Sequence, residues 1–93
     1  MLYMISYDLV APGRDYRALD ERITSLAGRR ILESQWLLTH TASCSDIWQD
    51  LYRFIDPNDR LLVNEMTNMA TWRTAGLLIT DAEMQAFLST ARI

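Results

Sequence analysis

The chain has 93 residues, of which 49% are hydrophobic and 23% charged, and its formal net charge is −3. This length suits one globular domain and excludes a second core of similar size. The acidic balance argues against a protein that coats nucleic acid generally, and no apolar run approaches the ~20 residues needed to span a bilayer. We therefore expect a cytoplasmic protein with no membrane partner.

The charged side chains are unevenly distributed along the chain. Residues 1–40 hold five arginines and five acids, whereas residues 41–93 hold four arginines and seven acids. Phosphate contacts are therefore expected on the N-terminal half. All nine cations are arginine, whose planar guanidinium binds phosphate or carboxylate through paired hydrogen bonds. Cys44 is the only cysteine, which excludes an internal disulfide and a zinc site built on a cysteine cluster.

The first predicted element is a strand over residues 3–9, rich in apolar and aromatic residues. Asp8 closes it, just before the breaker Ala11-Pro12-Gly13, so its carboxylate is expected at the edge of a sheet, where functional sites gather. The alternative is that Asp8 only braces the following turn, as aspartates before Pro-Gly segments often do.

The next segments alternate between helix and strand periodicity. Apolar residues spaced three and four apart predict an amphipathic helix over 15–26, and Gly28 is expected to end it. Residues 29–40 alternate as a strand pair or one long bent strand. The polar Glu33-Ser34-Gln35 centre predicts a bulge or a tight reversal there.

The second half of the chain continues this alternation. Ser43 or Ser45 is expected to cap a helix that ends at residues 56–59. Residues 61–66 read as a strand, 67–74 as a loop or extended arm, and 75–79 as a short extra strand. The sequence Thr80-Asp81-Ala82-Glu83 is typical of a capping box, and it predicts a final helix.

This order of elements predicts an α+β fold on the ferredoxin-like split βαβ plan. That fold is a sandwich, an antiparallel sheet with two helices on one face, here with an added C-terminal helix. We expect one domain over residues 1–93, with its core over about 1–67 and a C-terminal extension over 68–93. The second face of the sheet then needs a cover, either the C-terminal helix or another protomer's sheet, and a homodimer is the simpler expectation.

Three stretches carry a resemblance to a known family: Ser6-Tyr7-Asp8-Leu9, Ser34-Gln35-Trp36-Leu37 and the strand after Asp59-Arg60. Together they resemble the CRISPR-associated protein two superfamily, and the chain looks most like its stand-alone SinR-like and VapD-like members. The resemblance covers the layout of about residues 1–67. It implies a ferredoxin-like fold, a symmetric dimer joined through the sheets, and an Asp8 near its twin across the dimer axis. It also implies divalent-metal-dependent phosphodiester cleavage in some members and a purely structural or binding role in others.

Elementary chemistry supports the same site. Two Asp8 carboxylates facing each other repel, so they favour a shared proton or a shared cation. Mg²⁺ prefers oxygen ligands and bridges carboxylates to a substrate phosphate. The hydroxyls of Ser6 or Tyr7 are candidates to orient a phosphate or a water, and Arg14 and Arg17 are candidates to hold the nucleic-acid backbone. The alternative for both arginines is pairing with acids of the predicted helix.

Three further residues carry weaker signals. His40, the only histidine, is expected to be structural or exposed rather than a general base. Glu65 is a candidate second acid that faces Asp8 if the first and last core strands are neighbours. Trp72, in a polar stretch, is expected to anchor the arm at an interface with a partner.

Two functions from different classes remain open. The first is a small dimeric, magnesium-dependent endonuclease, an endoribonuclease acting on RNA, with Asp8 as its catalytic and metal-binding residue. The alternative is a non-catalytic homodimeric interaction module linked to a defence or toxin–antitoxin system. In a third and simpler interpretation, Asp8 is a turn residue and the chain has no partner beyond itself.

Overall fold

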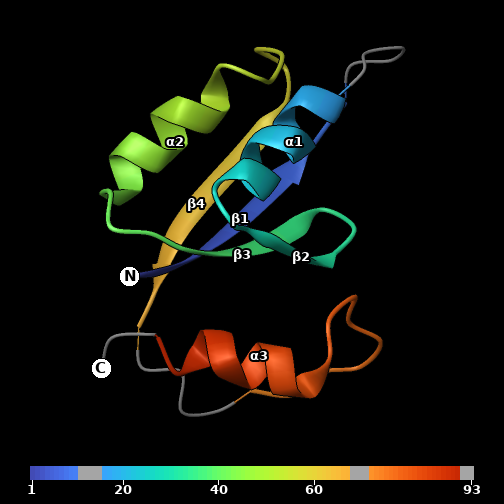
Figure 1. Ribbon diagram of the computed structural model, residues 1–93. Helices are drawn as coiled ribbons and strands as arrows, with labels where there is room; N and C mark the ends of the chain where they lie inside the picture. Colours follow the sequence, from blue (N-terminus) through green and yellow to red (C-terminus); the bar gives the residue numbers. More distant parts are fainter. Residues whose placement is uncertain (11–15, 68–71, 91–93) are drawn as a thin grey trace.

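The computed structural model describes residues 1–10, 16–67 and 72–90, which form an α+β protein with four strands and three helices (Figure 1). None of these helices is long and apolar enough to cross a bilayer. The elements are β1 (Leu2–Asp8), α1 (Arg17–Ser25), β2 (Arg29–Leu32), β3 (Gln35–Thr39), α2 (Cys44–Tyr52), β4 (Arg60–Met66) and α3 (Asp81–Leu88).

The four strands form one sheet in the order β2-β3-β1-β4, and all neighbouring strands are antiparallel. Because β1 lies between β3 and β4, both of its edges are hydrogen-bonded to neighbouring strands. The prediction of a reversal in residues 33–35 is confirmed, since Glu33 and Ser34 form the turn between β2 and β3. The pairing register of β2 also shifts between Arg30 and Leu32.

One face of the sheet is covered by α1 and α2, which lie together on that side (Figure 1). Side chains at alternate positions of β1 point toward these helices, as the two-residue period of a strand requires. Ser43, one of the two predicted caps of α2, accepts a hydrogen bond from the Asp46 N–H at 3.1 Å. The buried residues of this layer include Tyr3, Ile5, Tyr7, Leu19, Ile23, Ile47 and Leu51.

The opposite face of the sheet is covered in part by α3 (Figure 1). The predicted capping box is confirmed, because Thr80 Oγ1 accepts from the Glu83 N–H and Glu83 Oε1 accepts from the Thr80 N–H, each at 3.1 Å. A second buried cluster joins α3 and the segment before it to the sheet. Its members are Leu2, Ile31, Leu37, Ile79, Met84 and Leu88.

The rest of this second face lies beyond α3, toward the end of β1. Alternation along β1 places Ser6 and Asp8 on the same face as the buried Leu2. The pairing register adds a neighbour from each flanking strand, and Leu62 among them is 58% exposed. We call this region the open half of the sheet; it is formed by Ser6, Asp8, Gln35, Arg60 and Leu62.

One predicted element is wrong. Residues 75–79 form bends rather than a short strand, and their link to the sheet is the hydrogen bond from the Leu78 N–H to the Ile31 carbonyl at 2.9 Å. The apolar content of this segment serves burial instead, because Ile79 packs in the cluster under α3.

Candidate functional site

Asp8 is the last residue of β1, and its side chain is 66% exposed. The antiparallel register places it opposite Arg60, the first residue of β4. Arg60 Nη1 lies 3.6 Å from Asp8 Oδ2, and the Arg60 side chain is 74% exposed. Two charges at this distance in water attract weakly, so this ion pair contributes little to stability. The carboxylate therefore stands at the surface with a cation beside it.

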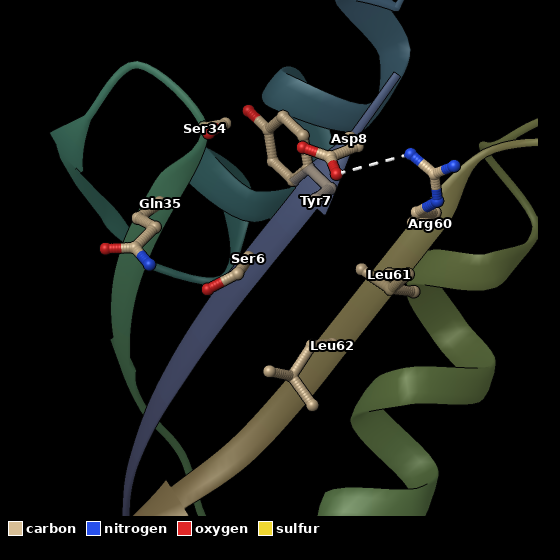
Figure 2. A pocket seen from close by; sticks show the side chains of 8 residues that line it. All are labelled: Ser6, Tyr7, Asp8, Ser34, Gln35, Arg60, Leu61 and Leu62. Carbon is tan, nitrogen blue, oxygen red and sulfur yellow. Dashed lines mark ion pairs between the residues drawn. The ribbon is translucent and has the colours of Figure 1, made fainter. Parts of the chain in front are cut away.

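The surface beside Asp8 is hollowed, over a volume of about 330 Å³ (Figure 2). Its chemistry is mixed, with one carboxylate, one guanidinium, two serine hydroxyls, one amide and the exposed side chain of Leu62. The lining residues are Ser6, Tyr7, Asp8, Ser34, Gln35, Arg60, Leu61 and Leu62.

Ser6 and Tyr7, the two candidate hydroxyls, lie on opposite faces of β1. Ser6 lies on the open half, opposite Gln35 of β3 and Leu62 of β4 (Figure 2). Its hydroxyl therefore belongs to the same surface as the Asp8 carboxylate.

The Tyr7 side chain packs toward the helices and is only 7% exposed. Its hydroxyl donates to Asp20 Oδ1 at 3.2 Å and accepts from Trp36 Nε1 at 2.9 Å. Burial raises the pKa of the Tyr7 phenol above its ordinary value, which keeps the hydroxyl protonated. Arg30 pairs with the same Asp20 at 2.6 Å, so Tyr7 belongs to a network on the α1 side of the sheet.

Of the two arginines predicted to hold nucleic acid, Arg14 lies outside the described residues. Arg17 is the first residue of α1, on the other side of the sheet, and does not line the hollow.

Arg60 lies there instead, and sequence reasoning did not select it as a site residue. The predicted antiparallel arrangement of the strands could have identified Arg60. When the first and last core strands are neighbours, the first residue of one meets the last residue of the other.

The prediction that Glu65 faces Asp8 is wrong. Although β1 and β4 are neighbours, as expected, Glu65 pairs with Tyr3 near the far end of both strands. Tyr3 points toward α1 and α2, so Glu65 lies on the opposite face from Asp8.

Trp72 and His40 are both engaged with their own chain. Trp72 is half-buried against the cluster beneath α3, on its own chain, and its predicted contact with a partner stays a prediction. His40 Nδ1 accepts a hydrogen bond from the Ala42 N–H at 2.9 Å, which is the structural role that the sequence favoured.

The hollow offers few ligands for a cation. Across the described ranges, no three His, Cys, Asp or Glu side chains gather closely enough to hold a metal ion. Side-chain oxygen atoms that line the hollow include the Asp8 carboxylate, the hydroxyls of Ser6 and Ser34, and the Gln35 amide. Mg²⁺ accepts such ligands together with several waters, but one carboxylate is few.

A scan of the chain against protein-family models finds no match. The described residues form an α+β protein with a four-stranded antiparallel sheet and a hollow of mixed polar and apolar lining at the end of the inner strand β1.

Proposed function

We propose that the chain is one protomer of a small homodimeric, magnesium-dependent endoribonuclease with the ferredoxin-like fold of the CRISPR-associated protein two superfamily. The strand order β2-β3-β1-β4 and the two helices on one face support this fold. The RNA substrate and the cytoplasmic location are predictions of the sequence.

The observation that carries the proposal is the position of Asp8. It is an exposed carboxylate at the end of the central strand, on a part of the sheet that α3 leaves uncovered. Carboxylates that only brace a turn hydrogen-bond to nearby backbone N–H groups. The contact of Asp8 is instead an ion pair across the sheet, with Arg60.

The dimer is proposed to form through the open half of the sheet. Leu62 projects from it, and Leu32 at the end of β2 is also exposed. A two-fold axis through this surface would bury both leucines against their copies. Because Asp8 lies on the same surface, the axis would also bring the two Asp8 carboxylates near each other, where one cation would relieve their repulsion.

Each side chain then has a defined task. The paired Asp8 carboxylates hold the cation, and the Ser6 hydroxyl on the same strand orients a water or a phosphate oxygen. Bound Mg²⁺ would supply charge neutralisation at the phosphate and an acidified water.

The test is cleavage of labelled single-stranded and duplex RNA and DNA with magnesium, with manganese and with chelator. We expect metal-dependent cleavage of RNA by the wild-type protein and none by Asp8→Asn, because the amide binds cations poorly. The matched control is Glu65→Gln, the same loss of charge on the opposite face of the sheet, which should cleave like the wild type. Equal cleavage by separately purified Asp8→Asn protein would contradict the proposal.

The exposed leucines of this surface favour a second candidate function. Leu62 and Leu32 suit a protein interface better than they suit phosphate. A non-catalytic homodimeric interaction module, linked to a defence or toxin–antitoxin system, would use the same surface. A wild-type protein that cleaves nothing with either metal, yet sediments at twice the chain mass, would support this alternative.

A further inference from the structure

The contact between Asp8 and Arg60 is a long ion pair. Its distance of 3.6 Å is longer than hydrogen-bond reach, so the pair is electrostatic only. Closer ion pairs among the described residues include Arg22–Asp50 at 2.7 Å, Arg29–Glu83 and Arg30–Asp20 at 2.6 Å each, and Arg53–Asp50.

The Arg60 guanidinium therefore has spare binding capacity. A guanidinium carries several N–H donors in a planar fork that matches two phosphate oxygens. In Arg60 this group is exposed, and its contact with Asp8 is not a hydrogen bond. Little contact energy has to be lost before it can bind another anion.

The surroundings suit a phosphate group in particular. Among the described residues that line the hollow, Arg60 is the cation, and the neighbouring polar groups Ser6, Ser34 and Gln35 are neutral. Hydroxyl and amide groups of this kind donate hydrogen bonds to phosphate oxygens in nucleic-acid complexes. Asp8 is the carboxylate of the same described lining, and Arg60 lies beside it (Figure 2).

We propose that Arg60 is the phosphate-binding residue of the Asp8 site, and that it leaves Asp8 for a backbone phosphate when RNA binds. The inference rests on the proposed function for its ligand. Once Arg60 contacts the phosphate, the Asp8 charge is no longer balanced by it and becomes available to a cation. RNA and cation therefore bind cooperatively, each strengthening the affinity for the other.

The experiment measures RNA binding without any cleavage. A short fluorescein-labelled single-stranded RNA is titrated with full-length protein in chelator, and fluorescence anisotropy gives the dissociation constant at several salt concentrations. The variants are Arg60→Gln and Asp8→Asn. Their controls are Arg53→Gln, at the C-cap of α2, and Glu65→Gln, which change the net charge equally away from the hollow.

Arg60→Gln should weaken binding by about tenfold relative to Arg53→Gln, since a charge-assisted contact is lost. It should also weaken the salt dependence: the negative slope of log affinity against log salt should become shallower by about 0.7 for each phosphate contact removed. Asp8→Asn should instead tighten binding by about two- to fivefold relative to Glu65→Gln, because Arg60 loses its competing partner. The salt slope of Asp8→Asn should stay at the wild-type value.

Three results would overturn the inference: no RNA binding by the wild type, equal affinity of Arg60→Gln and Arg53→Gln, or weaker binding by Asp8→Asn than by Glu65→Gln. These outcomes are distinct from a failure of the proposed function. A protein that shows the expected binding pattern but cuts nothing with magnesium or manganese keeps the phosphate site and loses the nuclease.

Discussion

Position 28 requires glycine because of space rather than backbone angle. A Cβ on Gly28 would lie 2.6 Å from Ile23 Cγ2 and 2.9 Å from the Ile23 carbonyl oxygen. The residue with positive φ is its neighbour Ala27, at 69°. The Gly28 N–H donates to the Ile23 carbonyl and the Ala27 N–H to that of Thr24, each at 2.9 Å, so α1 ends in a Schellman motif.

We predict that Gly28→Ala lowers the free energy of unfolding by about 1–3 kcal/mol, since Ile23 and the end of α1 must shift. Ala27→Gly is the matched change, and it should be neutral or raise stability by up to about 1 kcal/mol, because glycine tolerates positive φ. Urea unfolding followed by tryptophan fluorescence measures both. An unchanged midpoint for Gly28→Ala would show that the close approach is relaxed in solution.

Single residues of the site were predictable to different degrees. The end of a strand and its alternation place Asp8 and Ser6 on one surface, and both signals are local. The engagement of the Tyr7 hydroxyl could not be predicted from local sequence, because its hydrogen-bond partners Trp36 and Asp20 belong to two other elements. Arg60 lies in the more acidic half of the chain, where net charge argued against phosphate contacts. The pairing of β1 with β4 brings Arg60 next to Asp8, and the composition of the chain cannot predict this contact.

Among elements, α1 and α2 are joined by a pair of charges. Arg22 Nη2 lies 2.7 Å from Asp50 Oδ2, and Arg22 Nε donates to the same carboxylate, which Arg53 also contacts. The hydrogen bond from Arg22 is the largest cause that holds the pKa of Asp50 below its ordinary value of 3.8. Because the pKa is lower in the folded than in the unfolded protein, the contact stabilises the fold above pH 3.8. That contribution is lost as the pH falls through the folded value.

We therefore expect Asp50→Asn to be less stable than the wild type at pH 7, and to lose less further stability on acidification to pH about 3. Asp46→Asn, an exposed acid on the same helix, should keep the wild-type dependence on pH. Urea midpoints across this pH range provide the measurement. Parallel curves for the wild type and Asp50→Asn would mean that the contact is absent in solution.

Elements with their own local signals were predicted well. The caps of α2 and α3 and the reversal at residues 33–34 each depend on a few adjacent residues. Residues 75–79 have the composition of a strand, but among the described residues they form bends, with the Leu78 N–H bonded to the Ile31 carbonyl of the short edge strand β2. Hydrophobicity alone does not decide which side chains of α2 are buried, because Trp48 and Tyr52 are exposed and stack on each other with ring centroids 4.7 Å apart. Ile47 and Leu51 are the residues that fill the available core there.

At the scale of the whole molecule, the second face of the sheet has one part that α3 covers and one part that α3 leaves open. The sequence offered α3 or another protomer as its cover, and α3 covers the end near Leu2. The open half is the remainder, with Asp8, Arg60 and the exposed Leu62. This division depends on long-range packing, because Trp72 and Ile79 lie in the same cluster as Leu2 and Leu37 of the sheet.

The central claim is that two copies of Asp8 share one cation at the axis of a dimer. Titration with Mn²⁺, followed by the loss of its free electron paramagnetic resonance signal, tests this claim most directly. Asp8→Asn removes the ligand. Leu62→Glu places a charge on the open half, and Leu78→Glu makes the same change at a leucine that is 60% exposed but lies before α3.

We predict one bound Mn²⁺ for every two wild-type chains, with the same stoichiometry for Leu78→Glu. Asp8→Asn should bind none, because the carboxylate ligand is gone. Leu62→Glu should also bind none, because the two half-sites no longer meet. One cation per chain, or undiminished binding by Asp8→Asn, would contradict the shared site.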